Sequence, residues 1–166
     1  EGNYWFASSR QGVMKIAASS FVNHTDIPEL DGVVVNTTCM YEDMLYIGTD
    51  SGLYILDGNY QLIQTTLTET LSGIRIRAIK KDSTGKLWIC TYGENGLICY
   101  NGGDSWDSYN EEDGLSASKI RTVLELSDGT MAVAASGGVF LIKDGAVVQT
   151  YGTEEGIQNM EILCLC

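Results

Sequence analysis

The stretch LWICTYGENGLICYNG, residues 87–102, decides the fold of this 166-residue chain. It consists of two short apolar runs that are joined by a polar turn and followed by Asn-Gly. Similar stretches begin at Tyr4, Leu45 and Met131, so the same phrase occurs four times, at intervals of 41, 42 and 44 residues. A period near 42 residues limits the architecture to helical repeats of the HEAT or armadillo kind, or to propeller blades of four strands each.

The apolar runs are strands rather than helices because they are too short for helices of typical length. Leu45–Gly48, Gly52–Leu56 and Leu87–Thr91 contain four or five residues each and are rich in Ile, Leu, Tyr and Trp. Dipeptides that favour hairpin turns follow or separate such runs. These dipeptides are Asp57–Gly58, Asn101–Gly102, Asp128–Gly129 and Asp144–Gly145. The sequence therefore predicts an all-β fold.

Each repeat divides into four short strands, which is the composition of a propeller blade. In the best-formed copy the predicted strands are Ile76–Lys80, Leu87–Thr91, Gly96–Tyr100 and Ser105–Tyr109. Large residues at the second-strand position are expected to pack between neighbouring blades; these are Trp5, Tyr46 and Trp88. We predict one β-propeller domain over residues 1–166, with about four blades. The approximate blades are 1–35, 36–75, 76–117 and 118–152, with 153–166 as a leftover inner strand.

The strand order predicts that the chain starts and stops inside a blade. We expect a fragment of a larger propeller or a half that self-associates, with a homodimer formed through open blade edges. Closure of a four-bladed ring by the leftover strand is the alternative.

Charge and cysteine content narrow the possible partners. The formal net charge of −12 argues against nucleic acid and against docking on an anionic membrane surface. No apolar stretch is long enough for a transmembrane helix. The chain has five cysteines, an odd number, and all of them lie in apolar runs. We therefore expect buried free thiols rather than a disulfide framework.

The repeat resembles that of the two-component-regulator propeller family. Gly85–Gly102 match the family's pattern nearly throughout, and Leu45–Gly58 match it well. The Asp-Gly-Leu that typically precedes the first strand of this repeat occurs as Asp113–Leu115 and, in weaker form, as Glu155–Ile157.

The resemblance implies the extracytoplasmic sensor part of a bacterial membrane protein whose output domain is a histidine kinase or a diguanylate cyclase. Kinase sensors of this family are often associated with polysaccharide fragments. We therefore expect a non-catalytic ligand-sensing domain that binds a carbohydrate or another small molecule and uses no cofactor. A carbohydrate-active propeller enzyme, either a glycosidase or a lyase, and a purely protein-docking propeller remain alternatives.

Recognition is expected where variable loops and inner strands meet at one end of the propeller. The candidate ligand-binding residues are Arg10, Asn36, Arg75, Arg77, Arg121, Asn159 and Glu161. A structural ion pair of Arg77 or Arg121 with Glu161 or a loop carboxylate is an open alternative. No metal site is expected, because the acidic clusters Glu111–Asp113 and Glu154–Glu155 lack the alternating ligands of a calcium loop. His24 has no neighbouring motif that indicates a catalytic triad.

Overall fold

The computed structural model describes residues 4–8, 12–16, 27–158 and 162–166. The chain divides into two compact units, Glu1–Asp31 and Gly32–Cys166. Among the described residues, no helix is long and apolar enough to cross a membrane.

The first unit contains a β-hairpin formed by the first copy of the repeated phrase. Strands β1 (Tyr4–Ser8) and β2 (Gly12–Ile16) pair antiparallel, with Tyr4 opposite Ile16. A short 3-10 helix, η1 (Pro28–Leu30), follows later in the chain, and its proline occupies the start of the helix, where a missing N–H costs nothing.

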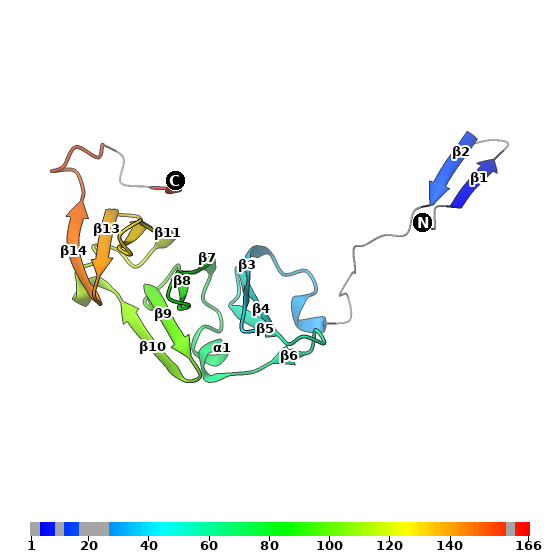
Figure 1. The fold of residues 1–166 in the computed structure, drawn as a ribbon, viewed down its shortest axis with the longest axis horizontal. Coiled ribbons are helices and arrows are strands. Elements are labelled where there is room, and N and C mark those ends of the chain that lie inside the picture. Colours follow the sequence, from blue (N-terminus) through cyan, green and yellow to red (C-terminus); the bar gives the residue numbers. More distant parts are fainter. Residues whose placement is uncertain (1–3, 9–11, 17–26, 159–161) are drawn as a thin grey trace. The chain divides into compact units, whose positions relative to one another are not determined.

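The second unit contains three antiparallel sheets of four strands each, and the sheets follow one another along the chain (Figure 1). Within each sheet, strands that are consecutive in the sequence are also neighbours. The first sheet consists of β3 (Val35–Tyr41), β4 (Met44–Thr49), β5 (Leu53–Leu56) and β6 (Leu62–Ile63). The second consists of β7 (Ile76–Lys81), β8 (Leu87–Thr91), β9 (Leu97–Gly102) and β10 (Ser105–Tyr109). The third consists of β11 (Ile120–Glu125), β12 (Met131–Ala135), β13 (Gly138–Lys143) and β14 (Ala146–Tyr151).

This architecture is an all-β partial propeller, as the sequence predicts. The strands of the second sheet begin and end within two residues of the predicted bounds. One predicted turn differs in detail. Gly102, Gly129 and Gly145 have positive φ, but in the turn that begins at Asp57 the residue with positive φ is Tyr60 (61°) and not Gly58.

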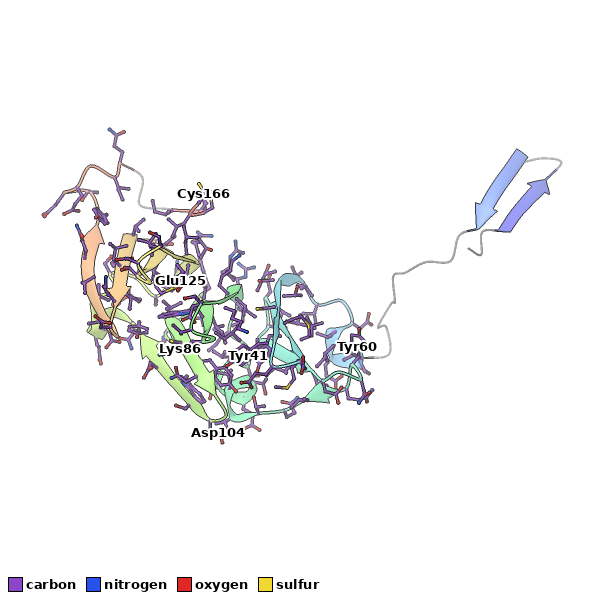
Figure 2. All side chains as sticks on the ribbon, viewed as in Figure 1. Tyr41, Tyr60, Lys86, Asp104, Glu125 and Cys166 are labelled. Carbon is purple, nitrogen blue, oxygen red and sulfur yellow. The ribbon has the colours of Figure 1, made fainter. Side chains whose placement is uncertain are left out.

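Two hydrophobic cores fill the spaces between consecutive sheets. The core between the first and second sheets contains Tyr41, which is labelled in Figure 2. The Tyr41 ring lies edge-on to that of Tyr46, with ring centroids 5.6 Å apart. Between the second and third sheets, Trp88 stacks on Tyr109 at 5.9 Å. Tyr46 and Trp88 are 1% and 5% exposed, which confirms that the second-strand aromatic residue packs between blades. Trp5 lies outside the residues whose side chains are described.

Close approach of the third and fourth strands within a sheet requires glycine at defined points. A Cβ on Gly96 would lie 2.1 Å from the carbonyl oxygen of Tyr109, and one on Gly138 would lie 2.1 Å from that of Tyr151. Gly96 directly precedes the third strand of its sheet and Gly138 begins the third strand of the next, and in each case the fourth strand ends beside the glycine. The buried Thr91 hydroxyl donates to the Gly96 carbonyl at 2.5 Å and so fixes this turn. The repeated Thr and Gly are therefore structural parts of the blade.

The loops that join one sheet to the next each carry a short helix and a buried leucine. The loop between the first and second sheets contains α1 (Thr66–Thr70), and Leu71 directly after it is fully buried. The loop between the second and third sheets contains η2 (Glu111–Asp113), and Leu115 after it is 1% exposed. These leucines attach the loops to the cores.

The cysteines are all free, but only some of them are buried. Cys90 and Cys99 lie in the core between the second and third sheets. Cys39 is half-buried, whereas Cys164 and Cys166 are exposed. The expectation of burial was wrong for these last two because an apolar run is buried only where other strands cover it, and residues 162–166 form no strand.

The predicted leftover strand at 153–166 includes residues 159–161, which lie outside the described residues. Residues 152–158 form turns and bends beyond β14. This strand and the predicted blade boundaries therefore stay predictions.

Candidate functional site

A β-bulge occurs at the same place in all three inner strands, β3, β7 and β11. In each of them, two residues of the inner strand oppose one residue of the second strand. The extra residues are Asn36, Arg77 and Arg121, because the pairing shifts between the residues on either side of them. A bulge residue has no opposing partner, and bulges commonly redirect a side chain beside a functional site. Three candidate site residues therefore share one structural position.

The residue that follows each second strand lies beside the start of the inner strand of the same sheet. The backbone N–H of Asp50 donates to Val34 at 3.1 Å, that of Tyr92 to Arg75 at 2.9 Å, and that of Ser136 to Lys119 at 3.1 Å. These bonds continue the ladder between first and second strands past the bulge. The bulges and the residues after the second strands consequently form one rim at this end of the sheets.

Asp50 is the centre of the rim between the first and second sheets. Arg75 donates from Nε to Asp50 Oδ1 at 2.7 Å and from its terminal nitrogen to Oδ2 at 2.5 Å, a two-bond pair. Asn36 Nδ2 donates to Asp50 Oδ1 at 2.7 Å and to the carbonyl of Ile76 at 3.0 Å. Hydrogen bonds from Arg75, and then from Asn36, hold the pKa of Asp50 below its ordinary value. Asp50 is therefore a fixed carboxylate that orients Asn36 and Arg75.

Tyr92 occupies the equivalent position between the second and third sheets. The ammonium of Lys119 lies 5.3 Å from the centre of the Tyr92 ring, and the guanidinium of Arg121 lies 5.2 Å from it. The terminal nitrogen of Arg121 also donates to the Tyr92 hydroxyl at 3.4 Å. Two cations therefore contact one aromatic side chain, an arrangement in which the ring's electron density offsets part of their repulsion.

Arg77 differs from the other two arginines of the rim. It is half-buried and close enough to Asp50 to contribute to lowering the pKa of that carboxyl. Within the part of the chain that the structure describes, however, Arg77 forms no hydrogen bond or ion pair. It is the bulge residue of β7, the inner strand that lies between β3 and β11.

The structure thus brings together four of the seven candidate residues, namely Asn36, Arg75, Arg77 and Arg121. Arg10, Asn159 and Glu161 lie outside the described residues, so their part in the site stays a prediction, as does an ion pair with Glu161. Sequence reasoning missed Asp50, Tyr92 and Lys119 as contacts of the candidates. The signal for the first two was present, because Asp50 and Tyr92 each follow the threonine that ends a second strand.

A recess of about 510 Å³ lies at the Asp-Gly turns, between the second and third sheets. Several of its polar groups have protein partners. Trp88 Nε1 donates to Asp82 Oδ2 at 2.8 Å, and the Ser83 hydroxyl and N–H donate to Glu125 at 2.5 and 2.8 Å. Burial raises the pKa of Asp82, but hydrogen bonds from Trp88, Thr84 and Lys86 outweigh burial and lower it. These contacts fasten one sheet to the next.

The acidic clusters do not form a metal site within the described residues, where no three Cys, His, Asp or Glu side chains gather as ligands. In η2, the carboxylate of Asp113 accepts from the N–H of Asn110 at 3.0 Å, and the Asn110 side chain accepts from Glu112. The acidic residues there serve as helix caps.

Residues 70–93 match the family model described as the two component regulator propeller. These residues are a two-component-regulator propeller repeat. They include the end of the loop helix, β7 with its bulge, and β8 up to Tyr92. The resemblance noted in the sequence is thereby confirmed. No curated protein sequence matches the chain.

Solved structures of bacterial extracellular domains share this fold. The extracellular domain of BT3049 from B. thetaiotaomicron, described as a hybrid two component system, superimposes on 95% of the chain with a TM-score of 0.72 and 22% identity. Two structures of the extracellular domain of BT4673 from the same organism give TM-scores of 0.67 and 0.63, with 18% and 20% identity, over 95% and 88% of the chain. The chain spans only 20–26% of the length of these proteins. At such identities the likeness establishes a common fold.

Proposed function

We propose that the chain is part of the ligand-sensing propeller of a membrane-bound bacterial signalling protein, of the histidine kinase or diguanylate cyclase type, and that this part lies outside the cytoplasm. Its ligand is a carbohydrate or another small molecule that binds at the rim formed by the three bulges. The main support for the proposal is that Asn36, Arg77 and Arg121 occupy the same bulge position in three successive repeats. The propeller repeat at residues 70–93 supports the signalling role.

The polar side chains of the rim are better suited to binding a ligand than to stabilising the blades. The bulge residues are the extra residues of the inner strands, and two of them are arginines in a chain with a net charge of −12. Polar side chains held at the end of a rigid sheet are pre-oriented, which reduces the entropy lost when a ligand binds.

A non-catalytic role agrees with the titration of the carboxylates. A glycosidase needs a general acid, and hence a carboxyl with a raised pKa. Among the described carboxyls with shifted pKa values, Asp50, Asp82 and Asp128 are all shifted downward. Each of these carboxylates accepts hydrogen bonds within the protein and is therefore held in its charged form.

The test is a thermal-shift screen of neutral and charged saccharides and other small molecules against the full chain. A variant in which Asn36, Arg77 and Arg121 are all replaced by Ala is compared with the wild type, and Lys143→Gln is the control because Lys143 pairs with Asp128 near the Asp-Gly turns. We expect hits that stabilise the wild type and the control but not the triple variant. Hits that stabilise all three equally would place recognition elsewhere, and turnover of a hit would contradict the non-catalytic role.

We also propose a homodimer formed through open blade edges. Three apolar residues on or beside β3 are at least half exposed, namely Val34 (58%), Val35 (50%) and Met40 (61%). A second copy of the chain would remove these side chains from water. Sedimentation velocity is expected to show a dimer that Met40→Lys weakens. A concentration-independent monomer would contradict this proposal.

A further inference from the structure

The outer edge of the first sheet has a gap that the other two sheets lack. In the second sheet, the fourth strand reaches the start of the third, where Tyr109 lies opposite Leu97. In the third sheet, Tyr151 lies opposite Val139 in the same way. The equivalent residue of the first sheet is Leu53, since each of the three directly follows the turn glycine. The fourth strand β6 has only two residues and ends before it reaches Leu53.

The turn glycines show the same difference. A Cβ on Gly96 or Gly138 would lie 2.1 Å from the carbonyl oxygen at the end of the fourth strand. The nearest atom to a Cβ on Gly52 is instead the carbonyl oxygen of Leu71, at 3.1 Å, and Leu71 is the last residue of the α1 turn. The hydroxyl of Thr49 donates to the Gly52 carbonyl at 2.8 Å, as the equivalent threonine of the second sheet donates to Gly96. The three glycines are therefore equivalent, and only Gly52 has no fourth strand beside it.

The chain leaves the ladder at Thr65 because the backbone of this residue bonds to the start of α1. Thr65 would lie opposite Leu53 if the pairing of β5 with β6 continued in the same register. Its N–H instead donates to the Thr68 hydroxyl at 2.9 Å, and its carbonyl accepts from the N–H of Glu69 at 3.0 Å. The capping of α1 thus removes the backbone groups that would have completed the sheet.

The N–H and the carbonyl of Leu53 point into this gap. The carbonyl of Gly52 faces β4, where it accepts from the N–H of Thr49 at 3.0 Å, so the backbone groups of the next residue face away from β4. The neighbouring positions along this edge are occupied. The carbonyl of Ser51 accepts a hydrogen bond at 2.8 Å from the loop after α1, and Ile55 is paired with β6. No described residue bonds to the N–H or the carbonyl of Leu53 on this side.

The gap opens into a recess of about 350 Å³, which is within the size range of small-ligand sites. The recess is lined by residues of β5, β6 and α1, which are labelled in Figure 1. Leu53, Leu62 and Ile63 supply apolar surface. Glu69 supplies the one carboxylate, and the lining includes no Lys or Arg. The remaining polar groups are those of Ser51, Tyr54, Gln64, Thr68 and Ser72.

We propose that this recess binds an extended peptide, one residue of which pairs with Leu53 in place of the missing fourth strand. An extended amino-acid residue presents its own N–H and C=O on the same side, so it can donate to the carbonyl of Leu53 and accept from its N–H together. A single trans amide, such as that of an N-acetylated sugar, has its N–H and C=O on opposite sides and can form only one of these bonds.

The charge of the recess specifies the peptide further. Glu69 is exposed and carries the one carboxylate of the lining, so it favours a positively charged group, either a lysine side chain or a peptide N-terminus. This inference goes beyond the ligand proposed for the rim, because none of Asn36, Arg77 and Arg121 lines the recess.

The first test is amide hydrogen exchange of the full chain, followed by NMR with and without peptide. The amide of Leu53 is expected to exchange about tenfold or more faster than that of Leu97, which is paired with Tyr109, and to slow when peptide is added. Equal protection of the two amides in the free chain would overturn the inference, because another group of the chain would then already fill the gap.

The second test is an NMR titration with N-acetyl-lysine N-methylamide, a single residue that has both backbone groups. Its analogue methylated on the lysine backbone nitrogen lacks one of the two hydrogen bonds, so its affinity should be lower by roughly three- to tenfold. N-acetylglucosamine and the corresponding glutamate derivative should also bind more weakly than the lysine derivative. Equal binding of the lysine derivative and its methylated analogue would overturn the inference, as would stronger binding of the sugar or a lack of binding by the lysine derivative.

Two carboxylate variants locate the peptide. Glu69→Gln should weaken binding of the lysine derivative by about two- to fivefold and leave that of an alanine derivative unchanged. Glu111→Gln is the matched control, because Glu111 is an exposed carboxylate in η2, in the equivalent loop after the second sheet. Equal effects of the two substitutions would contradict binding in the recess.

Two further comparisons identify the source of the peptide and separate this site from the rim. Preference for Ala-Lys-Ala with free ends indicates an oligopeptide ligand, whereas preference for the same peptide with blocked ends indicates a segment within a protein. The variant with Ala at Asn36, Arg77 and Arg121 should bind the lysine derivative as the wild type does. Loss of binding in that variant would overturn the recess as the peptide site, whereas loss of a rim ligand alone leaves the inference intact.

Discussion

Substitution of Gly96 by alanine tests the close packing at the third strand of the second sheet. Gly96 has φ of +61°, and an added Cβ would lie 2.1 Å from the carbonyl oxygen of Tyr109 and 3.1 Å from its carbonyl carbon. Both atoms belong to the backbone, so no side-chain rotation can relieve the contact. The end of β10 must therefore move, and with it Tyr109, whose ring stacks on Trp88 in the core.

The expected cost combines two contributions. An alanine in the left-handed region costs about 1 kcal/mol or somewhat more. Displacing a packed strand end costs about 2 kcal/mol, by analogy with overpacked cores. We therefore expect Gly96→Ala to lower the free energy of unfolding by about 3 kcal/mol.

Two other glycines of the same chain separate these contributions. Gly85 has φ of +92° with no atom within 4 Å of an added Cβ, so Gly85→Ala should cost only the backbone strain, about 1 kcal/mol. Gly58 has open space and no positive φ, so Gly58→Ala should leave stability unchanged or raise it by up to about 1 kcal/mol through the unfolded state.

The assay is urea unfolding of the three variants and the wild type, followed by tryptophan fluorescence and by circular dichroism. Coincident transitions from the two probes are required before free energies are compared. Equal costs for Gly96→Ala and Gly85→Ala would refute the reasoning, because the contact with Tyr109 would then contribute nothing.

Three further predictions concern the threonine, aspartate and cysteine positions of the blades. Thr91→Val removes the buried hydroxyl that donates to the Gly96 carbonyl at 2.5 Å, so it should lower the free energy of unfolding in urea by about 1–2 kcal/mol. Thr38 is partly exposed, and Thr38→Val should cost less. Equal losses would contradict a stabilising role for the Thr91 hydrogen bond. Asp82 has a lowered pKa, so it contributes stability above its unfolded value of about 3.9 that is lost as the pH falls through the lower folded value. Asp82→Asn should therefore destabilise the chain at neutral pH and progressively less in acid, and a pH-independent difference in unfolding free energy would be evidence against it. Burial raises the pKa of Cys99 to about 11 and also raises that of Cys90. Iodoacetamide at mildly alkaline pH should therefore modify exposed Cys164 in the native chain and should modify Cys90 and Cys99 only after unfolding. Mass spectrometry of the labelled peptides measures the order of labelling, and labelling of Cys90 or Cys99 before Cys164 would contradict the prediction.

The fold could be predicted because each blade repeats its own local signals. Short apolar runs, glycines at turns and the spacing of the repeat gave strand bounds in the second sheet that differ from the structure by two residues at most. The positive φ at Tyr60 could not be predicted in this way, because the Asp57 side chain, which accepts from the N–H groups of Asn59 and Gln61, determines the shape of that turn. A dipeptide rule does not include such a contact.

The candidate site was predictable in its members but not in its geometry. Asn36, Arg77 and Arg121 stand out as polar residues in apolar inner strands, and equivalent spacing relates them. That each is the extra residue of a bulge follows only from the pairing of two strands, which no single strand's pattern shows. The pair of cations on Tyr92 was missed for a similar reason, since Tyr92 belongs to one sheet and Lys119 and Arg121 to the next.

A residue that binds a ligand usually has to fit its neighbours in the sheet as well, and the bulges separate these two requirements. Cross-strand neighbours must fit one another in size and shape, so a change at a paired position disturbs the sheet. Asn36, Arg77 and Arg121 fall between the cross-strand pairs of the inner and second strands. Substitutions at these positions can therefore accumulate during evolution without the compensating changes that a core residue needs. Propellers with the same blades can thus diverge in what they recognise by exchanging one residue per blade.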